Sequence, residues 1–243
     1  ENKIVVEHKK LIPKLPRKAV DHKIKVSFLA HACLLFESED FSFATDPWLQ
    51  GFAFASGWWV KNKKPENWVE KLNGVDFIYI SHNHPDHLNE FTLAEIRKDM
   101  PFIIPNFSSK SVEKLMVKFG FNNLIKFDFD NFYQYGNKDL YFSILKSGDF
   151  RDDSGFYFTY GDFSFLSAVD SNDLNFSRLP DDVTIFAASF AGGSSGYPLC
   201  FDTVHEDNKK KIIIRNRNAI KAINQKTIKL TNAEYFLPYA GFF

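Results

Sequence analysis

Short apolar runs separated by polar turns dominate the chain and predict a succession of β-strands. Between residues 23 and 45, the run KIKVSFLAHACLLFES is followed by FSFAT after a charged turn, which predicts neighbouring strands that pair. The runs VDFIYIS (75–81) and PFIIP (101–105) are rich in β-branched and aromatic residues, which is typical of buried strands. The first hundred residues therefore predict one sheet with at least one fully covered face.

The second half of the chain predicts further strands. From residue 124 to 169, Phe, Tyr and Ile alternate with polar residues, and turn residues interrupt them at 135–137 and 160–162, which predicts a β-meander. The runs VTIFAASF (183–190) and AEYFLPYA (233–240) predict the last two strands.

Three segments favour helices instead. TLAEIRKDM (92–100) has helical composition, SKSVEKLMVKFG (109–120) is amphipathic and ends at a glycine, and NKKKIIIRNRNAIKAIN (208–224) is basic and amphipathic. Residues 51–68, rich in Gly and Trp, are expected to form a loop packed by its own aromatic residues. We interpret residues 1–22 as an extended leader and residues 23–243 as one layered α/β domain.

Composition and charge exclude several classes of protein. Thirty Lys and Arg balance thirty Asp and Glu, so no positive excess favours a nucleic-acid partner. No apolar run approaches the roughly 18 residues that span a bilayer, so we expect no membrane role. Cys33 and Cys200 are the only cysteines of the sequence, too few for a disulfide framework or a Cys-rich metal module, and we expect a cytoplasmic protein.

The sequence SHNHPDH, at residues 81–87, carries the candidate chemistry. Three His and one Asp follow a predicted buried strand directly, at the end where layered α/β proteins place their sites. Imidazole and carboxylate together suit Zn, Fe or Mn, and the spacing lets His82 and His84 face one ion while Asp86 and His87 face a second. Asp170, which ends the run FSFLSAVD, is the best candidate for a bridging carboxylate, although a role as a turn cap is nearly as well supported.

A wider resemblance accompanies this motif. HNHPDH resembles the HxHxDH signature of the metallo-β-lactamase superfamily, which implies an αββα four-layer sandwich of two sheets flanked by helices. Further segments are similar, in the same order, to the CMP-N-acetylneuraminate hydroxylase family: AHAC (30–33), DPWLQGFAFASGWW (46–59), DFIYISHNHPDHLNEFTL (76–93), AVD (168–170), FAGGSSGYP (190–198) and LPYAGFF (237–243). The resemblance covers most of the chain from about Lys23 onward.

The resemblance also implies two further histidine ligands that this sequence lacks. The first would fall near residues 148–150, where Phe150 stands at the matching position with Asp149, Asp152 and Asp153 nearby, so we include Asp149 among the candidate ligands. The second would fall near the C-terminal end, where Tyr239 or Ala240 stands instead. The resemblance places His31 and Asp46 near the site, and we take His31 together with Asp86 as catalytic candidates.

Candidate substrate-binding residues lie in two loops and near the C-terminal end. Consecutive Gly and Ser amides can cradle an anion, which makes Gly192, Gly193 and Ser194 candidates, although a tight structural loop is equally consistent with them. Trp58 and Tyr239 are candidates for the wall of a sugar or base site, whereas core packing is the commoner role of such side chains.

Three functions fit these observations. The first is a hydrolase that uses hydroxide on one or two divalent ions, Zn or Fe, against an anionic or sugar-nucleotide-like substrate. The second is an iron-dependent oxygenase. The resembled family pairs this domain with a Rieske iron–sulfur domain, whose two Cys and two His ligands this chain does not supply, so a separate Rieske or reductase protein would deliver the electrons. The third is a degenerate module that binds a nucleotide sugar without turnover.

Overall fold

The computed structural model describes residues 4–5, 23–61, 63–171, 174, 179–190 and 197–241. The predicted leader, residues 1–22, lies outside these ranges except for Ile4–Val5, which form strand β1. The glycine-rich loop with Gly192, Gly193 and Ser194 also lies outside them, so its predicted anion-binding role stays a prediction.

Six strands form the first sheet, in the order β2-β3-β4-β7-β8-β9. The first three pair antiparallel, and the pairs from β4 through β9 are parallel, as expected for strands linked by helical crossovers. Their bounds are Lys25–Ala30 (β2), Cys33–Glu37 (β3), Ser42–Thr45 (β4), Phe77–Tyr79 (β7), Phe102–Pro105 (β8) and Leu124–Phe127 (β9).

Seven strands form the second sheet, in the order β1-β10-β11-β12-β13-β14-β15. The strands are antiparallel up to β13 and parallel from β13 to β15. After β1, their bounds are Tyr133–Tyr135 (β10), Leu140–Lys146 (β11), Ser154–Tyr160 (β12), Phe163–Val169 (β13), Ile185–Ser189 (β14) and Tyr235–Tyr239 (β15).

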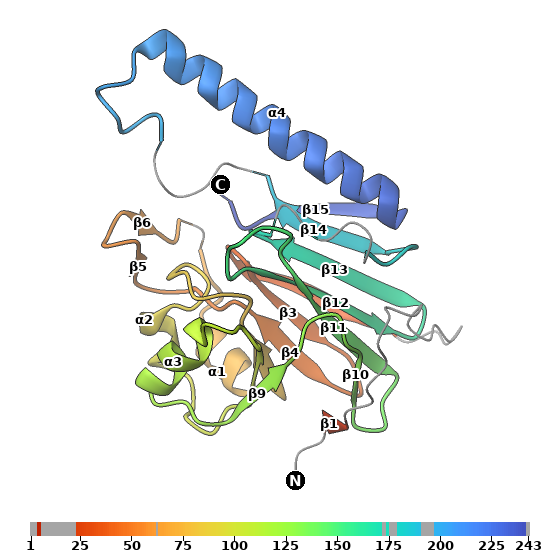
Figure 1. Cartoon of the computed structure of the whole chain (residues 1–243). Coiled ribbons are helices and arrows are strands. Elements are labelled where there is room, and N and C mark those ends of the chain that lie inside the picture. The colour runs from red at the N-terminus through yellow and green to blue at the C-terminus, as the bar shows by residue number, and fades with distance from the viewer. Residues whose placement is uncertain are drawn as a thin grey trace.

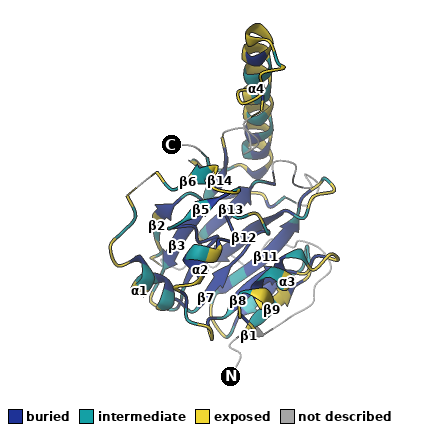
Figure 2. Ribbon diagram, turned by 90° about the vertical axis from the view of Figure 1, so that its left-hand side faces the viewer, coloured by how far each residue is buried: buried dark blue, intermediate teal, exposed yellow. Residues whose placement is uncertain are grey.

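Helices cover the outer faces of both sheets (Figure 1). Helices α1 (Trp68–Asn73), α2 (Glu90–Leu93) and α3 (Ser111–Lys118) lie over the first sheet. Helix α4 (Glu206–Thr231) runs beside β14 and β15 and projects beyond the rest of the fold, where most of its residues are exposed (Figure 2). The predicted αββα four-layer sandwich is therefore confirmed. Within the residues described, no helix is both long and apolar enough to cross a membrane.

Three details differ from the sequence-based expectation. The sequence pattern predicts β9 as part of the meander, but β9 pairs with β8 in the first sheet. The alternation of apolar and polar residues predicts a strand and does not determine which strand it pairs with. Residues 51–68 hold a small hairpin, β5 (Phe52–Ala53) and β6 (Trp58–Trp59), rather than a loop alone. The helix expected over 92–100 is the short α2, whereas the basic helix extends over 26 residues.

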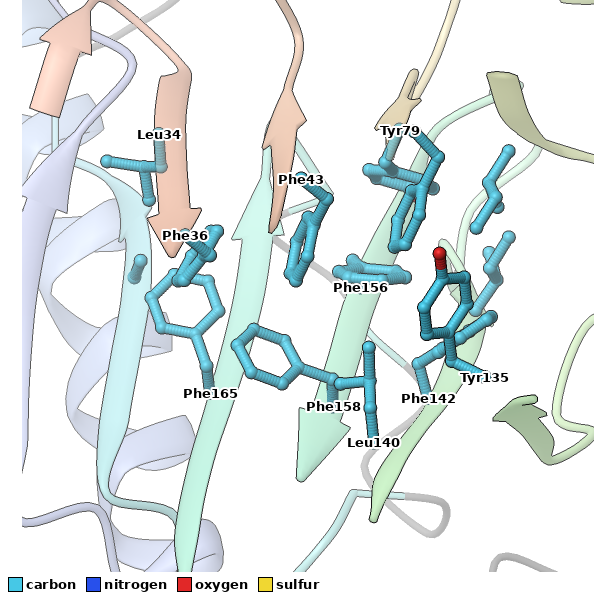
Figure 3. Close-up of a cluster of buried hydrophobic side chains, with 14 of the residues drawn as sticks. Leu34, Phe36, Phe43, Tyr79, Tyr135, Leu140, Phe142, Phe156, Phe158 and Phe165 are labelled. Carbon is cyan, nitrogen blue, oxygen red and sulfur yellow. The ribbon is translucent and has the colours of Figure 1, made fainter. Parts of the chain in front are cut away.

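A phenylalanine-rich core joins the two sheets (Figure 3). Phe36 and Phe43 from the first sheet stack with ring centroids 4.7 Å apart, and Phe158 from β12 meets Phe43 edge to face at 5.2 Å. Aromatic pairs at these separations add to the burial of apolar surface. Because alternate residues of β12 enter this layer while Tyr157 packs toward α4, the strand is buried on both faces.

We expect Phe158→Ala to lower the free energy of unfolding by about 3–5 kcal/mol, the usual cost of emptying a buried phenylalanine site. The matched control is Phe150→Ala, because Phe150 is 98% exposed whereas Phe158 is 0% exposed. Urea unfolding of the two variants measures the difference, and equal midpoints would contradict this account of the core.

Candidate metal centre

Residues from both sheets meet at one edge of the sandwich. His31 lies in the turn between β2 and β3, Asp46 follows β4, and residues 82–87 follow β7. From the second sheet, Asp153 precedes β12 and Asp170 follows β13. The strand ends thus bring together side chains that lie up to 139 positions apart in the sequence, from His31 to Asp170.

The backbone at this edge adopts an unusual conformation. His31, Asp46, Val169 and Ala240 have positive φ values of 47°, 37°, 51° and 50°, although none is glycine. Such values are uncommon for residues with a Cβ and unfavourable for a β-branched residue such as Val169. Because strain of this kind tends to persist at functional sites, the backbone independently marks the same edge as the side chains do.

The carboxylate of Asp46, which is fully buried, orients the motif loop. It accepts hydrogen bonds from the backbone N–H of Ser81 (2.7 Å), from Ser81 Oγ (2.7 Å) and from His87 Nδ1 (3.2 Å). Since Ser81 Oγ gives its one proton to Asp46, the 2.9 Å contact with His82 Nδ1 assigns the donor role to that ring nitrogen. His82 and His87 therefore both present Nε2 lone pairs to the cluster, as metal-binding histidines do when their other nitrogen is held.

Within the described part of the chain, three groups of side chains have the composition and spacing to hold a metal ion, and two of them share no residue. The first is His82, His84 and Asp153, with His82 Nε2 2.9 Å from His84 Nδ1 and 3.7 Å from Asp153 Oδ1. Asp170 Oδ2 lies 3.9 Å from His82 Nε2 and 3.7 Å from His87 Nε2. The Asp170 carboxylate thus lies between the first group and His87, which belongs to the second group.

The second group is His31, Asp86 and His87. Asp86 Oδ2 lies 3.1 Å from His31 Nε2 and 3.5 Å from His87 Nε2. The His31 ring also meets the His87 ring edge to face, with centroids 5.3 Å apart. These two groups divide the motif as predicted, with His82 and His84 in one and Asp86 and His87 in the other, whereas the third group, His82, His87 and Asp170, joins the two sides. The assignment of each residue to an ion stays a prediction.

Burial and neighbouring charges shift the pKa values of the cluster. Burial lowers the pKa of His82 well below its usual value, and His87 and His84 reinforce that direction. Burial opposes ionisation of Asp86, yet His87 and the His31 hydrogen bond hold the pKa of Asp86 well below its usual range. Burial raises the pKa of both Asp153 and Asp170. Burial lowers the pKa of His87, but Asp86 and the hydrogen bond to Asp46 outweigh it and raise that pKa well above its usual value. Because a neutral imidazole is the form that binds a metal ion, His87 has to release a proton when an ion binds.

Three atoms of the cluster have no hydrogen-bond partner among the residues that the structure describes. They are Asp86 Oδ1, His87 Nε2 and Asp153 Oδ2, all buried. Buried polar atoms are nearly always satisfied, and an unsatisfied one carries a desolvation cost of about 1–3 kcal/mol. Arg151 Nη1 lies 3.3 Å from Asp153 Oδ2 and compensates its charge, so Asp86 Oδ1 and His87 Nε2 are the two atoms without a partner that fit a cation.

Two predicted site residues are not placed as expected. The Asp149 carboxylate accepts hydrogen bonds from Arg151 Nε at 2.6 Å and Ser147 Oγ at 3.0 Å and belongs to none of the groups, whereas Asp153, from the same loop, belongs to the first. Tyr239 is only 1% exposed and its hydroxyl hydrogen-bonds with Ser167 Oγ, so it packs in the core and offers no surface to a substrate.

The β5–β6 hairpin adds an aromatic wall. Trp58 meets the His31 ring at 6.5 Å between centroids, and Phe54, which the sequence argument did not single out, meets the His84 ring at 6.0 Å. Asn89 ties this hairpin to the motif loop, because its side-chain amide donates to Phe52 O (3.1 Å) and Pro85 O (2.9 Å). The predicted contact of Trp58 with a substrate remains a prediction, and its position beside the cluster is compatible with it.

A family model and the similar proteins of known name agree on the family of this chain. Residues 25–165 match the family described as a beta-lactamase superfamily domain. The chain is 31% identical over 96% of its length to a human protein named inactive cytidine monophosphate-N-acetylneuraminic acid hydroxylase, and 32% identical over 95% of its length to the hydroxylase of Mus musculus. These alignments cover 48% and 41% of the relatives, so the chain spans about half the length of the curated proteins it matches or less.

Solved structures confirm the metallo-β-lactamase fold. CmlA, described as a diiron β-hydroxylase from Streptomyces venezuelae, aligns with a TM-score of 0.61 and 17% identity over 93% of this chain and 45% of its own. Isothiocyanate hydrolase from Delia radicum gut bacteria aligns with a TM-score of 0.57 and 15% identity over 88% of this chain and 84% of its own. The fold thus supports both hydroxylases and hydrolases.

Asp46→Asn should lower the free energy of unfolding by about 1–3 kcal/mol, because the amide cannot accept all three hydrogen bonds and leaves a buried donor unpaired. The control is Asp202→Asn, since Asp202 is exposed in the segment before α4. Urea unfolding of the metal-free proteins measures both effects. If Asp46→Asn unfolds at the same midpoint as the wild type, the ordering role of this carboxylate is refuted.

Proposed function

Because the chain belongs to the beta-lactamase superfamily, we propose that the strand-end cluster holds two metal ions and is the catalytic centre of an iron-dependent hydroxylase. The substrate class we propose is an anionic sugar or sugar nucleotide. The sequence by itself favours a hydrolase. Two findings favour a hydroxylase over a hydrolase. The relatives that align along nearly the whole chain are named hydroxylases, and the cluster is rich in carboxylates.

The observation that carries the metal assignment is the set of unpaired buried acceptors. Asp86 Oδ1 and His87 Nε2 both belong to the second group, whereas Asp153 Oδ2 faces Arg151. A cation bound in the second group satisfies these two atoms, whereas a role in core packing leaves them desolvated. The residues therefore fit the group that the family implies.

The same geometry supports a complete set of ligands despite the two absent histidines. Asp153 joins His82 and His84 on one side. On the other side, Ala240 N–H donates to the His31 carbonyl at 3.2 Å, so the C-terminal end of β15 lies next to His31. We infer that His31 takes the place of the histidine expected near Ala240 and completes the group of Asp86 and His87.

Carboxylate content favours iron over zinc. Imidazole suits zinc and iron alike, but carboxylate shifts the preference toward harder ions. Bound iron would supply the activation of dioxygen: one oxygen atom enters a C–H bond and the other leaves as water, with two electrons and two protons from an external reductase or Rieske protein. The chain's own residues would hold the ions, and Phe54 and Trp58 flank the histidines His84 and His31 of the two groups.

A zinc-dependent hydrolase is the second candidate. The observation in its favour is the arrangement of the two groups around Asp170 Oδ2, which suits a pair of metal ions that clamp a substrate oxygen and lower the pKa of bound water. Hydrolysis needs no external electrons, so the two candidates differ in their requirement for dioxygen and a reductant.

His84→Ala should remove most of the metal bound in the first group, because His84 supplies one of its three protein ligands. His205→Ala is the control: His205 is exposed and hydrogen-bonds the N–H of Asp207 at the start of α4. Elemental analysis after anaerobic loading with Fe(II) measures the content. Equal metal in His84→Ala and the wild type would count against the assignment.

Turnover separates the two candidate functions. The iron-loaded protein, incubated with CMP-N-acetylneuraminate, a chemical reductant and ¹⁸O₂, should yield a product with one added ¹⁸O atom, detected by mass spectrometry. The parallel arm uses zinc-loaded protein without reductant or dioxygen. Cleavage of the substrate in that arm, with no ¹⁸O incorporation in the first, would replace the hydroxylase by the hydrolase.

A further inference from the structure

Arg151 lies against the cluster and touches three acidic residues with one guanidinium group. Its Nε donates to Asp149 Oδ2 at 2.6 Å, its Nη1 lies 3.3 Å from Asp153 Oδ2, and its Nη2 donates to the backbone oxygen of Asp170 at 3.4 Å. Asp153 belongs to the first group, and the side chain of Asp170 lies between the two groups. A residue from outside the groups therefore contacts a candidate ligand carboxylate of the first group and the backbone of Asp170.

The two oxygens of Asp153 have separate neighbours. Oδ1 lies 3.7 Å from His82 Nε2, on the side of the first group, whereas Oδ2 lies toward Arg151. The Asp153 side chain is 3% exposed, so water offers little competition for its orientation. The cation beside Oδ2 thus favours the rotamer that turns Oδ1 toward His82 and His84.

Asp149 holds Arg151 in this position. Its Oδ2 accepts a hydrogen bond from Arg151 Nε. Its Oδ1 accepts hydrogen bonds from the backbone N–H of Arg151 (3.0 Å) and from Ser147 Oγ (3.0 Å). The backbone of this loop is also closed independently of the guanidinium, by Ser147 N–H to Asp153 O at 3.0 Å. Loss of the Arg151 charge can therefore be tested without removing the bonds that shape the loop.

We propose that Arg151 is a positioning residue that holds the Asp153 carboxylate in the rotamer that faces His82 and His84, and so sets the metal affinity of the first group. Asp149 acts one step further out, by holding Arg151. This inference rests on the proposal that the cluster binds metal ions. It assigns a role to the pair Arg151 and Asp149, which lies outside both groups of ligands.

The test compares Arg151→Gln with Arg97→Gln. Arg97 is a matched control, because it also pairs with an aspartate two positions away (Asp99, 2.8 Å) and its side chain is 38% exposed against 42% for Arg151. Each protein is titrated with Co(II) under anaerobic conditions, and the visible absorption of the bound ion reports the geometry of its ligands. Urea unfolding of the metal-free proteins is measured in parallel.

We expect Arg151→Gln to weaken one of the two Co(II) binding steps by about 10–100-fold, the usual effect of removing a group that orients a ligand. Arg97→Gln should bind as the wild type does. Arg151→Lys should restore part of the affinity, because it keeps the charge, and Asp149→Asn should weaken the same step by a smaller factor. The Co(II) spectrum of that step should change in Arg151→Gln.

Two other results would overturn the inference. Unchanged Co(II) affinity and spectrum in Arg151→Gln would show that Asp153 is positioned without it. A loss of stability in the metal-free Arg151→Gln protein, with no recovery of metal affinity in Arg151→Lys, would reduce Arg151 to a residue that stabilises the loop. If the wild type itself binds no Co(II), the proposed metal centre fails, and that outcome is distinguishable from a failure of the Arg151 role alone.

Discussion

The buried carboxylate of Asp46 is the constraint on which the candidate site depends. A carboxylate without solvent needs a donor for nearly every lone pair, and here Ser81, at the end of β7, supplies two donors and His87 a third. Ser81 and His87 are turned toward Asp46 for this reason, and His82 is turned through Ser81. The direction in which two imidazoles point is therefore decided by a residue 35 or more positions away in the sequence.

A second buried network aligns the two sheets at the same edge. Ser154 Oγ donates to the Ser81 carbonyl at 2.6 Å and lies 2.7 Å from the Tyr79 hydroxyl, so the end of β7 is joined to the start of β12. The next residues along these strands are His82 and Asp153, which belong to the same group of candidate ligands. The sandwich thus brings a histidine of one sheet to an aspartate of the other by hydrogen bonds between their neighbours.

Features that depend on adjacent residues could be predicted from the sequence, whereas contacts between distant parts of the chain could not. The strands were predictable, because alternation depends on adjacent residues, and the division of residues 82–87 into two pairs followed from their spacing. The choice of Asp153 over Asp149 was not predictable, since it depends on a loop that turns one carboxylate inward and commits the other to Arg151. His31 was placed near the site by resemblance alone, and its contact with Asp86 depends on strands from separate parts of the first sheet. An arginine flanked by Asp149 and Asp153 was the one local signal for the Arg151 contacts.

Charge explains why an arginine accompanies an aspartate at this place. The resemblance implies a histidine near residues 148–150, whereas the residue of this loop that reaches the cluster is Asp153, which adds a negative charge to Asp46, Asp86 and Asp170. An extra buried anion repels its neighbours and favours protonation unless a cation compensates it. Arg151 provides that cation, and Asp149 pairs with another nitrogen of the same guanidinium. In the proposed metal centre, Arg151 thus offsets part of the charge that a carboxylate brings in place of a histidine, and the harder carboxylate oxygen would favour iron.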